Sequence, residues 1–230
     1  NKKYNCSINN ISDKTSLLAV QGPKAELLCE SFTKEDLKSL SNYSFILGKF
    51  AGIDDVIISK TGYTGSGGFE LYISNDYAEH IWDKLFSVVN LEVKPIGLGA
   101  RDTLRIEMGY CLYGNDLDES VTPIEANLGW ITKLETNFIG SKSIKEQIEN
   151  GIKKKLVGFV INDKGIPRKG YEIFDESEKL IGEVTSGTFS PVLKKGIGLA
   201  YIEKYISSKE IYLKIRNNFI KLEVVKTPFI

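Results

Sequence analysis

The chain has 230 residues, and its 30 Lys and Arg balance 30 Asp and Glu, so no net charge favours nucleic acid or an anionic membrane. Its 42% hydrophobic, 10% aromatic and 26% charged residues are typical of a globular protein and exclude disordered, collagen-like and coiled-coil chains. No apolar run approaches the ~20 residues that span a bilayer. We therefore expect a folded protein with no nucleic-acid or membrane partner.

The cysteine and histidine content argues against several kinds of disulfide and metal site. Cys6, Cys29 and Cys111 are odd in number and far apart, which argues against a disulfide framework or a cysteine zinc site and fits a reducing cytoplasm. The single histidine, His80, excludes a two-histidine metal site. We expect a cytoplasmic protein with no metal centre. The only methionine is Met108, so the sequence is expected to be a piece of a longer protein.

The first part of the chain mixes helix and strand patterns. In chain order, they predict helices over 23–32 and 33–40, strands over 43–50, 55–60 and 68–74, and helices over 75–89, 98–109 and 140–150. The third strand alternates cleanly, with Phe69, Leu71 and Ile73 on one face and Glu70 on the other.

After Lys153 the pattern becomes all-β. Short β-rich segments alternate with turn residues, and they lie at 156–161, 171–174, 180–185, 197–202 and 211–225. We therefore predict two domains, an α+β part over 1–150 and a compact β-barrel or jelly-roll-like part over 151–230.

A glycine-dense segment at 60–70 has two interpretations. It lacks the G-K-[ST] ending of a P-loop and leads into a strand, which disfavours phosphate binding. It can be a hairpin loop, or its small residues can let a planar ligand approach the backbone while Tyr63 supplies an aromatic face.

Two charged residues are candidate ligand contacts. Glu70 is either solvent-exposed or lines a cavity, where its carboxylate could accept two parallel N–H bonds from the amino-pyrimidinone edge of a pterin. A helical wheel places Arg101 inside an apolar arc, which predicts a buried guanidinium with either an internal carboxylate or a ligand as partner. Arg105, one turn on, could share either task.

Further along the chain, structural roles are favoured over chemistry. Thr122 and Glu125 form the capping box of a predicted helix start, so Glu125 is expected to be structural. Trp130 is expected in the core, with stacking on a ligand as the alternative. Three carboxylates are predicted to form a polar loop rather than a metal site: Asp116, Asp118 and Glu119.

Seven motifs stand in one order along the chain. They are L-A-V-Q-G-P from Leu18, T-G-Y-T-G from Thr61 with F-E-L from Phe69, G-A-R-D from Gly99 with L-R from Leu104, C-L-Y-G-N-D from Cys111, T-P-I-E-A from Thr122, G-W from Gly129, and T-S-G from Thr185. Each motif alone is weak, but the ordered set resembles the aminomethyltransferase of the glycine cleavage system, its T protein. The resemblance runs from about Leu17 to Phe229 and matches only the later part of the family's sequence.

The resemblance implies an α+β, folate-binding aminomethyltransferase-like fold, present here in part, followed by a C-terminal antiparallel β-barrel. In the family, a methylene unit passes from the aminomethyl-lipoyl arm of H protein to tetrahydrofolate, and ammonia leaves. The implied partners are therefore lipoylated H protein and tetrahydrofolate.

The positions that match the family's folate contacts are Tyr63, Glu70, Arg101 and Trp130. The aspartate that assists the folate nitrogen in the family matches no position here, so no catalytic residue is assigned and the chain is expected to be an incomplete enzyme. The alternatives are a non-catalytic folate-binding module and the folate domain of a dehydrogenase of methylated glycines.

Overall fold

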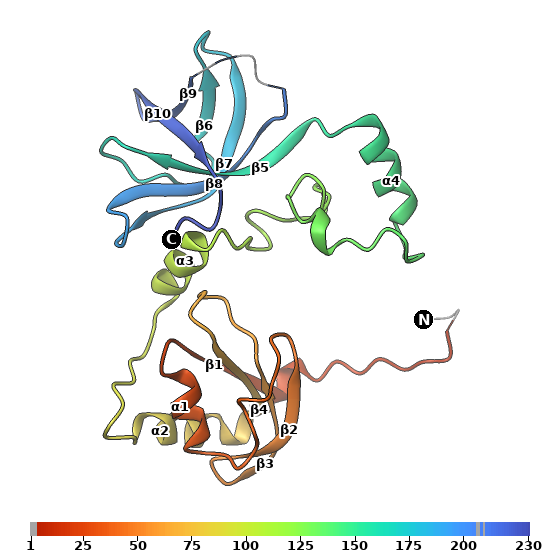
Figure 1. Ribbon diagram of the computed structural model, residues 1–230, viewed down its shortest axis with the longest axis vertical. Coiled ribbons are helices and arrows are strands. Elements are labelled where there is room, and N and C mark those ends of the chain that lie inside the picture. Colours follow the sequence, from red (N-terminus) through yellow and green to blue (C-terminus); the bar gives the residue numbers. More distant parts are fainter. Residues whose placement is uncertain (1–3, 206–207, 209) are drawn as a thin grey trace. The chain divides into compact units, whose positions relative to one another are not determined.

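The computed structural model describes residues 4–205, 208 and 210–230 (Figure 1). It divides into two compact units, Asn1–Gly97 and Leu98–Ile230. This division falls before residue 150 because helix α3 (Leu98–Glu107) packs against strands β7 (Leu180–Ser190) and β8 (Lys195–Glu203) of the second unit. The domains 1–150 and 151–230 stay a prediction.

The first unit is a four-stranded antiparallel sheet with two helices on one face (Figure 1). The strand order is β1-β4-β3-β2, with bounds Thr15–Gln21, Gly68–Ser74, Ile53–Ser59 and Phe45–Phe50. The helices are α1 (Ala25–Glu30) and α2 (Ala78–Phe86), and the short 3-10 turns are η1 (Ser12–Lys14) and η2 (Asn75–Tyr77). Alternation along β4 buries Phe69, Leu71 and Ile73 against the helices, as the sequence predicts.

Two features of this unit differ from the predicted elements. Residues 33–40 form isolated turns rather than a helix, because side chains bond the local backbone there. Ser39 N donates to Asp36 Oδ1 at 3.2 Å, and Glu35 N donates to Thr33 Oγ1 at 3.1 Å. Strand β1 is the second difference, because no predicted element covers residues 15–21.

The second unit contains a closed, six-stranded antiparallel barrel, which confirms the predicted C-terminal barrel. Its order is β10-β5-β8-β7-β6-β9, and the remaining bounds are Asn218–Val225, Lys154–Ile161, Glu172–Asp175 and Ile211–Ile215 for β10, β5, β6 and β9. The predicted strand 211–225 is a hairpin of β9 and β10, because Arg216 takes a left-handed φ of 56° between them.

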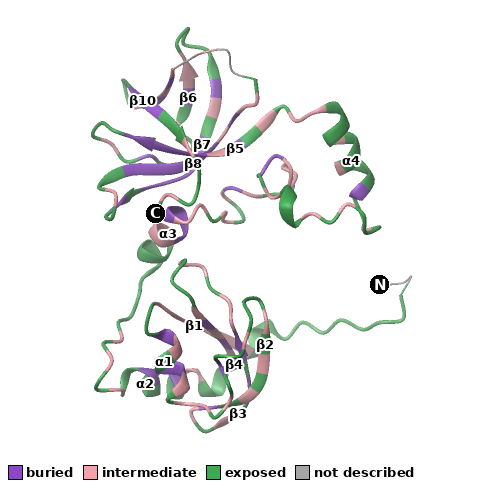
Figure 2. Ribbon diagram, in the orientation of Figure 1, coloured by how far each residue is buried: buried purple, intermediate pink, exposed green. Residues whose placement is uncertain are grey.

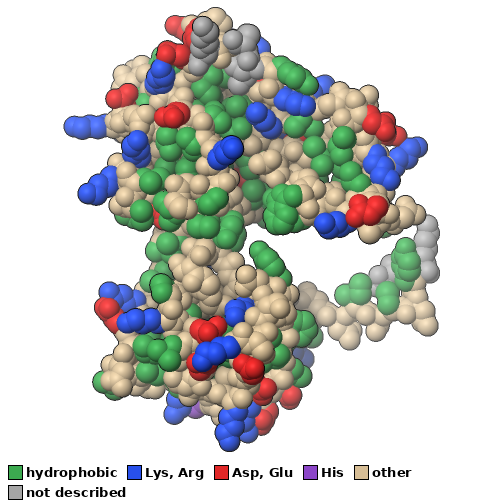
Figure 3. Space-filling model, viewed as in Figure 1, with side chains coloured by type: hydrophobic (Ala, Val, Ile, Leu, Met, Phe, Trp, Pro, Cys, Tyr) green, Lys and Arg blue, Asp and Glu red, His purple; other side chains and the backbone are tan. Residues whose placement is uncertain are grey.

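The rest of the second unit is less buried. Helix α4 (Ser141–Asn150) buries only Ser141 among its residues, and the 3-10 turn η3 (Gly129–Ile131) buries none, whereas burial is concentrated in the barrel strands (Figure 2). Acidic and basic side chains are interspersed on the viewed surface (Figure 3). Among the described residues, no helix has the length and apolar character needed to cross a membrane.

Candidate functional site

Glu70 lies on the sheet face opposite α1 and α2, where the antiparallel register arranges side chains in rows across the strands. It pairs with Ala19 of β1 and with Ser59 of β3, and Phe45 of β2 pairs with Ser59. One row across all four strands therefore contains the carboxylate.

The neighbouring row on this face is apolar. Tyr72 pairs with Leu17 of β1 and with Ile57 of β3, and Leu47 of β2 pairs with Ile57. Leu17, Leu47 and Ile57 are 46%, 60% and 37% exposed, although a solvated sheet face usually carries polar side chains. This face thus combines an apolar surface with a carboxylate, which suits a planar ligand with a polar edge.

The Glu70 carboxylate is half-buried and fixed by a neighbour. Thr61 Oγ1 donates to Glu70 Oε2 at 2.5 Å and lies 3.0 Å from Ser59 Oγ. Burial raises the pKa of the Tyr72 hydroxyl, and the Glu70 charge raises it further. Tyr72 therefore keeps its hydroxyl proton at neutral pH.

Tyr63 is half-buried in the loop of residues 60–67, between β3 and β4. Gly65 and Gly67 take positive φ angles of 76° and 74° there, which glycine adopts more readily than other residues. The glycine-dense segment is thus a loop between two antiparallel strands, and it places Tyr63 in the same unit as Glu70.

The prediction that Arg101 is buried is wrong, because Arg101 is exposed and the buried arginine is Arg105. The predicted apolar arc depended on Leu98, which is 81% exposed. Helix α3 instead buries Arg105, Ile106 and Glu107, and Ile106 belongs to a cluster with barrel residues. The exposed Arg101 remains a predicted ligand contact.

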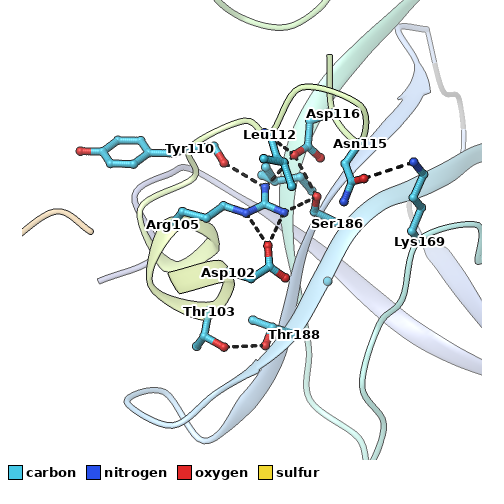
Figure 4. A network of polar contacts seen from close by, with 12 residues as sticks. Asp102, Thr103, Arg105, Tyr110, Leu112, Asn115, Asp116, Lys169, Ser186 and Thr188 are labelled. Atoms are coloured by element: carbon cyan, nitrogen blue, oxygen red, sulfur yellow. Dashed lines mark hydrogen bonds and ion pairs between the residues drawn. The ribbon is translucent and has the colours of Figure 1, made fainter. Parts of the chain in front are cut away.

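Arg105 lies at the centre of a buried polar network (Figure 4). Its Nε donates to Asp102 Oδ1 at 2.8 Å, and its Nη2 donates to Ser186 Oγ at 2.7 Å. Its Nη1 donates to the Tyr110 carbonyl at 3.0 Å and to Asp116 Oδ2 at 2.7 Å. Every nitrogen of the guanidinium has an acceptor, so the buried charge is compensated. The network joins α3, the loop that follows it, and β7.

Asp116, predicted in a polar loop, is buried with 1% exposure. Its carboxylate accepts hydrogen bonds from Arg105, Leu112 N, Ser186 Oγ and the Thr185 hydroxyl. Only the folded loop brings these donors together, so no local sequence pattern distinguishes Asp116 from neighbouring carboxylates. Within 4–205, 208 and 210–230, no three His, Cys, Asp or Glu residues are grouped to hold a metal ion.

The predicted capping box is present without its helix. Thr122 N donates to Glu125 Oε2 at 3.0 Å, and Glu125 N donates to Thr122 Oγ1 at 3.3 Å, which gives Glu125 the structural role expected of it. Asn127 takes a left-handed φ of 60° and ends the turn. Trp130 is 74% exposed, so its predicted core position is wrong.

The structure brings two of the four predicted folate contacts into one unit. Tyr63 and Glu70 belong to the sheet unit, whereas Arg101 and Trp130 belong to the unit that contains the barrel. A pocket shared by all four residues stays a prediction.

Two family models match the chain. The GCVT N-terminal domain matches residues 1–136, and the glycine cleavage T-protein C-terminal barrel domain matches residues 154–230. The first match covers the sheet unit and extends into the second unit, and the second match covers the closed barrel. The chain belongs to the glycine cleavage T-protein family.

Several named proteins are similar to this chain. Aminomethyltransferases from Flavobacterium psychrophilum, Porphyromonas gingivalis and Thermosipho melanesiensis are 51%, 52% and 46% identical to it. The alignments cover 96%, 96% and 99% of this chain but 62%, 63% and 62% of those proteins. The chain thus spans about three fifths of the length of the curated relatives it matches.

A solved structure is also similar. The crystal structure of glycine cleavage system aminomethyltransferase T from Bartonella henselae aligns with a TM-score of 0.83 and 31% identity. The alignment covers 94% of this chain and 60% of that one.

Proposed function

We propose that this chain supplies the folate-binding sheet face and the barrel of an aminomethyltransferase. The reaction moves a methylene unit from the aminomethyl-lipoyl arm of H protein to tetrahydrofolate and releases ammonia. The carbon breaks its bonds to the lipoyl sulfur and the amino nitrogen, and it forms bonds to two folate nitrogens. The two protons that these nitrogens lose are balanced by the thiol and the ammonia that are released. The observation that carries the proposal is the half-buried carboxylate of Glu70 within an apolar sheet face.

The chemistry of this face fits the pterin ring of tetrahydrofolate. A carboxylate accepts two parallel N–H bonds from an amino-pyrimidinone edge. Tyr63 offers an aromatic surface in the loop of residues 60–67, and Leu17 and Ile57 offer apolar contact. Thr61 holds one carboxylate oxygen and so limits the orientations that Glu70 adopts.

The remaining contacts and partners are proposed from the resemblance. Arg101, exposed on the first turns of α3, can donate to acceptor atoms of the folate, and Trp130 can stack on its planar parts. Lipoylated H protein is the proposed macromolecular partner. We place the reaction in the cytoplasm, where thiols such as Cys29 stay reduced.

The proposal is tested by calorimetry of tetrahydrofolate binding to the wild-type chain and to Glu70→Gln. The substitution keeps the side-chain volume but removes the charge, and we expect it to weaken binding by ~1.5–3 kcal/mol. Glu183→Gln, on the barrel strand β7, is the matched control and should bind as the wild type does.

Circular dichroism on both variants establishes that they are folded. Equal affinities for the wild type and a folded Glu70→Gln variant would remove Glu70 from the site. Folate binding by a full-length protein that releases no ammonia from aminomethylated H protein would favour the non-catalytic folate-binding module.

A further inference from the structure

One side chain of β1 reaches both ends of the Tyr63 loop. Gln21 Nε2 donates to the carbonyl of Thr61, at the start of the loop, at 3.1 Å. It also donates to the carbonyl of Phe69, at the start of β4, at 3.1 Å. A single amide thus cross-links two backbone segments that are separated by the glycine-dense loop.

Two glycines next to this amide leave no room for a side chain of their own. A Cβ on Gly62 would lie 2.0 Å from Gln21 Oε1, and a Cβ on Gly68 would lie 2.3 Å from the carbonyl oxygen of Val20. Gly68 also takes a φ of 140°, which only glycine adopts readily. The two glycines therefore allow the loop to lie directly against Gln21.

The orientation of the amide follows from what surrounds it. Both nearby acceptors are carbonyls, so only the NH2 group of Gln21 can face them. Its Oε1 is then buried, and it has no hydrogen-bond partner among the described residues. The two donated bonds therefore fix which end of the amide faces the loop.

We propose that Gln21 is a positioning residue for the ligand-binding groups of the sheet unit. It holds Thr61, whose hydroxyl donates to Glu70, and it holds Phe69, the neighbour of Glu70 in β4. Tyr63 follows Thr61 by two residues in the same loop. The role assigned to these groups rests on the proposed folate-binding function, whereas the cross-link itself does not.

The test compares Gln21→Met with the wild-type chain. Methionine has a similar length but cannot donate to the two carbonyls. The matched control is Asn75→Leu, because Asn75 Nδ2 donates to the Asp13 carbonyl at 2.8 Å at the opposite end of the β1–β4 pair. Hydrogen exchange read by mass spectrometry reports the order of residues 61–69, and calorimetry reports tetrahydrofolate affinity.

For Gln21→Met we expect about tenfold faster exchange confined to residues 61–69 and about tenfold weaker tetrahydrofolate binding, with neither change in Asn75→Leu. A double variant with Glu70→Gln should lose less affinity than the product of the single losses, since both changes act on one group. A purely global loss of stability would give additive losses.

Unchanged exchange in residues 61–69, or an increase spread evenly over the chain, would overturn the positioning role. If Gln21→Met does not fold, Gln21→Asn keeps the amide one methylene shorter and should show a smaller local increase in exchange. A wild-type chain that binds no tetrahydrofolate, with the local exchange effect intact, would overturn the proposed function and leave the loop cross-link standing.

Discussion

Arg105 and Asp116 form an ion pair in which Nη1 lies 2.7 Å from Oδ2 and the two side chains are only 1% and 0% exposed. The pair connects α3 to the loop that follows it, and Ser186 of β7 bonds both partners. Removing two charges from water is unfavourable unless each is paired and hydrogen-bonded. This network meets that condition and fixes α3 to the barrel.

Removing one partner of this pair should be strongly destabilising. Arg105→Met leaves Asp116 buried with fewer donors, and we expect the free energy of unfolding to fall by ~3–5 kcal/mol. Urea denaturation followed by circular dichroism measures the loss. Lys142→Met, which removes an exposed pair with Glu146, should change it by less than about 0.5 kcal/mol. A loss below about 1 kcal/mol for Arg105→Met would contradict a compensated buried pair.

Local sequence patterns predict the strand β4 but not which arginine of α3 is buried. Alternation in residues 68–74 predicts β4 with its bounds, because one face of the sheet packs against α1 and α2. Arg101 and Arg105 both belong to the predicted helix, but its pattern cannot tell which of them the barrel covers. Burial of Arg105 depends on the barrel, which is distant in sequence, so tertiary packing decided the outcome.

In the candidate site, too, the sequence predicts the positions of some residues and not of others. Glu70 lies on the face opposite Phe69, Leu71 and Ile73, as its strand pattern predicts. Trp130, by contrast, is exposed although its size and apolar character favour a core position. The roles of Gln21 and Asp116 depend on groups that loop geometry brings together. Sequence spacing alone contains no information about such contacts.

Two adjacent glycines should respond differently to alanine. Gly67 has a φ of 74° and open space around its Cβ position, so Gly67→Ala should cost about 1 kcal/mol of the free energy of unfolding. Gly68→Ala should cost ~3 kcal/mol or more, because its φ is 140° and its Cβ would lie 2.3 Å from the Val20 carbonyl. Urea denaturation of both variants gives the comparison, and equal losses would contradict close packing at Gly68.

The three thiols should differ in reactivity at pH 8. Burial raises the pKa of Cys29 to about 12. It raises that of Cys111 to about 11, where the Asp116 charge adds to the increase and the Arg105 charge opposes it. Only the thiolate reacts with iodoacetamide, and Cys6 is exposed. Peptide mass spectrometry should therefore show Cys6 modified roughly tenfold or more faster than Cys111.

The raised pKa of Cys111 also makes the stability of the chain depend on pH. The folded chain keeps the Cys111 proton up to a higher pH than the unfolded chain does. Cys111 therefore leaves the free energy of unfolding unchanged below about pH 9 and lowers it as the pH rises from about 9 to about 11. In concentrated urea all three thiols should react at similar rates. Equal rates for Cys6 and Cys111 in the folded chain would show that Cys111 is not protected.

This chain alone should catalyse ammonia release slowly. Proton transfer at the folate nitrogen is assisted by an acid–base side chain within hydrogen-bond reach. The aspartate that the family resemblance assigns to this role matches no position here. We expect the chain to release ammonia from aminomethylated H protein at least about 100-fold more slowly than a protein of the relatives' full length.

Three carboxylates near the predicted contacts in the sequence, Asp102, Asp116 and Glu125, are poor replacements because they are already engaged. Arg105 binds Asp102 and Asp116, and Thr122 holds Glu125 in its cap.

The assay compares ammonia release with tetrahydrofolate at equal enzyme concentrations, and Lys142→Met in the longer protein serves as a control that should keep the full rate. Equal rates for the short and long proteins would place the catalytic carboxylate within these 230 residues. In that case Asp102, half-exposed beside Arg101, would be the residue to substitute first, because its carboxylate alone among these three reaches solvent.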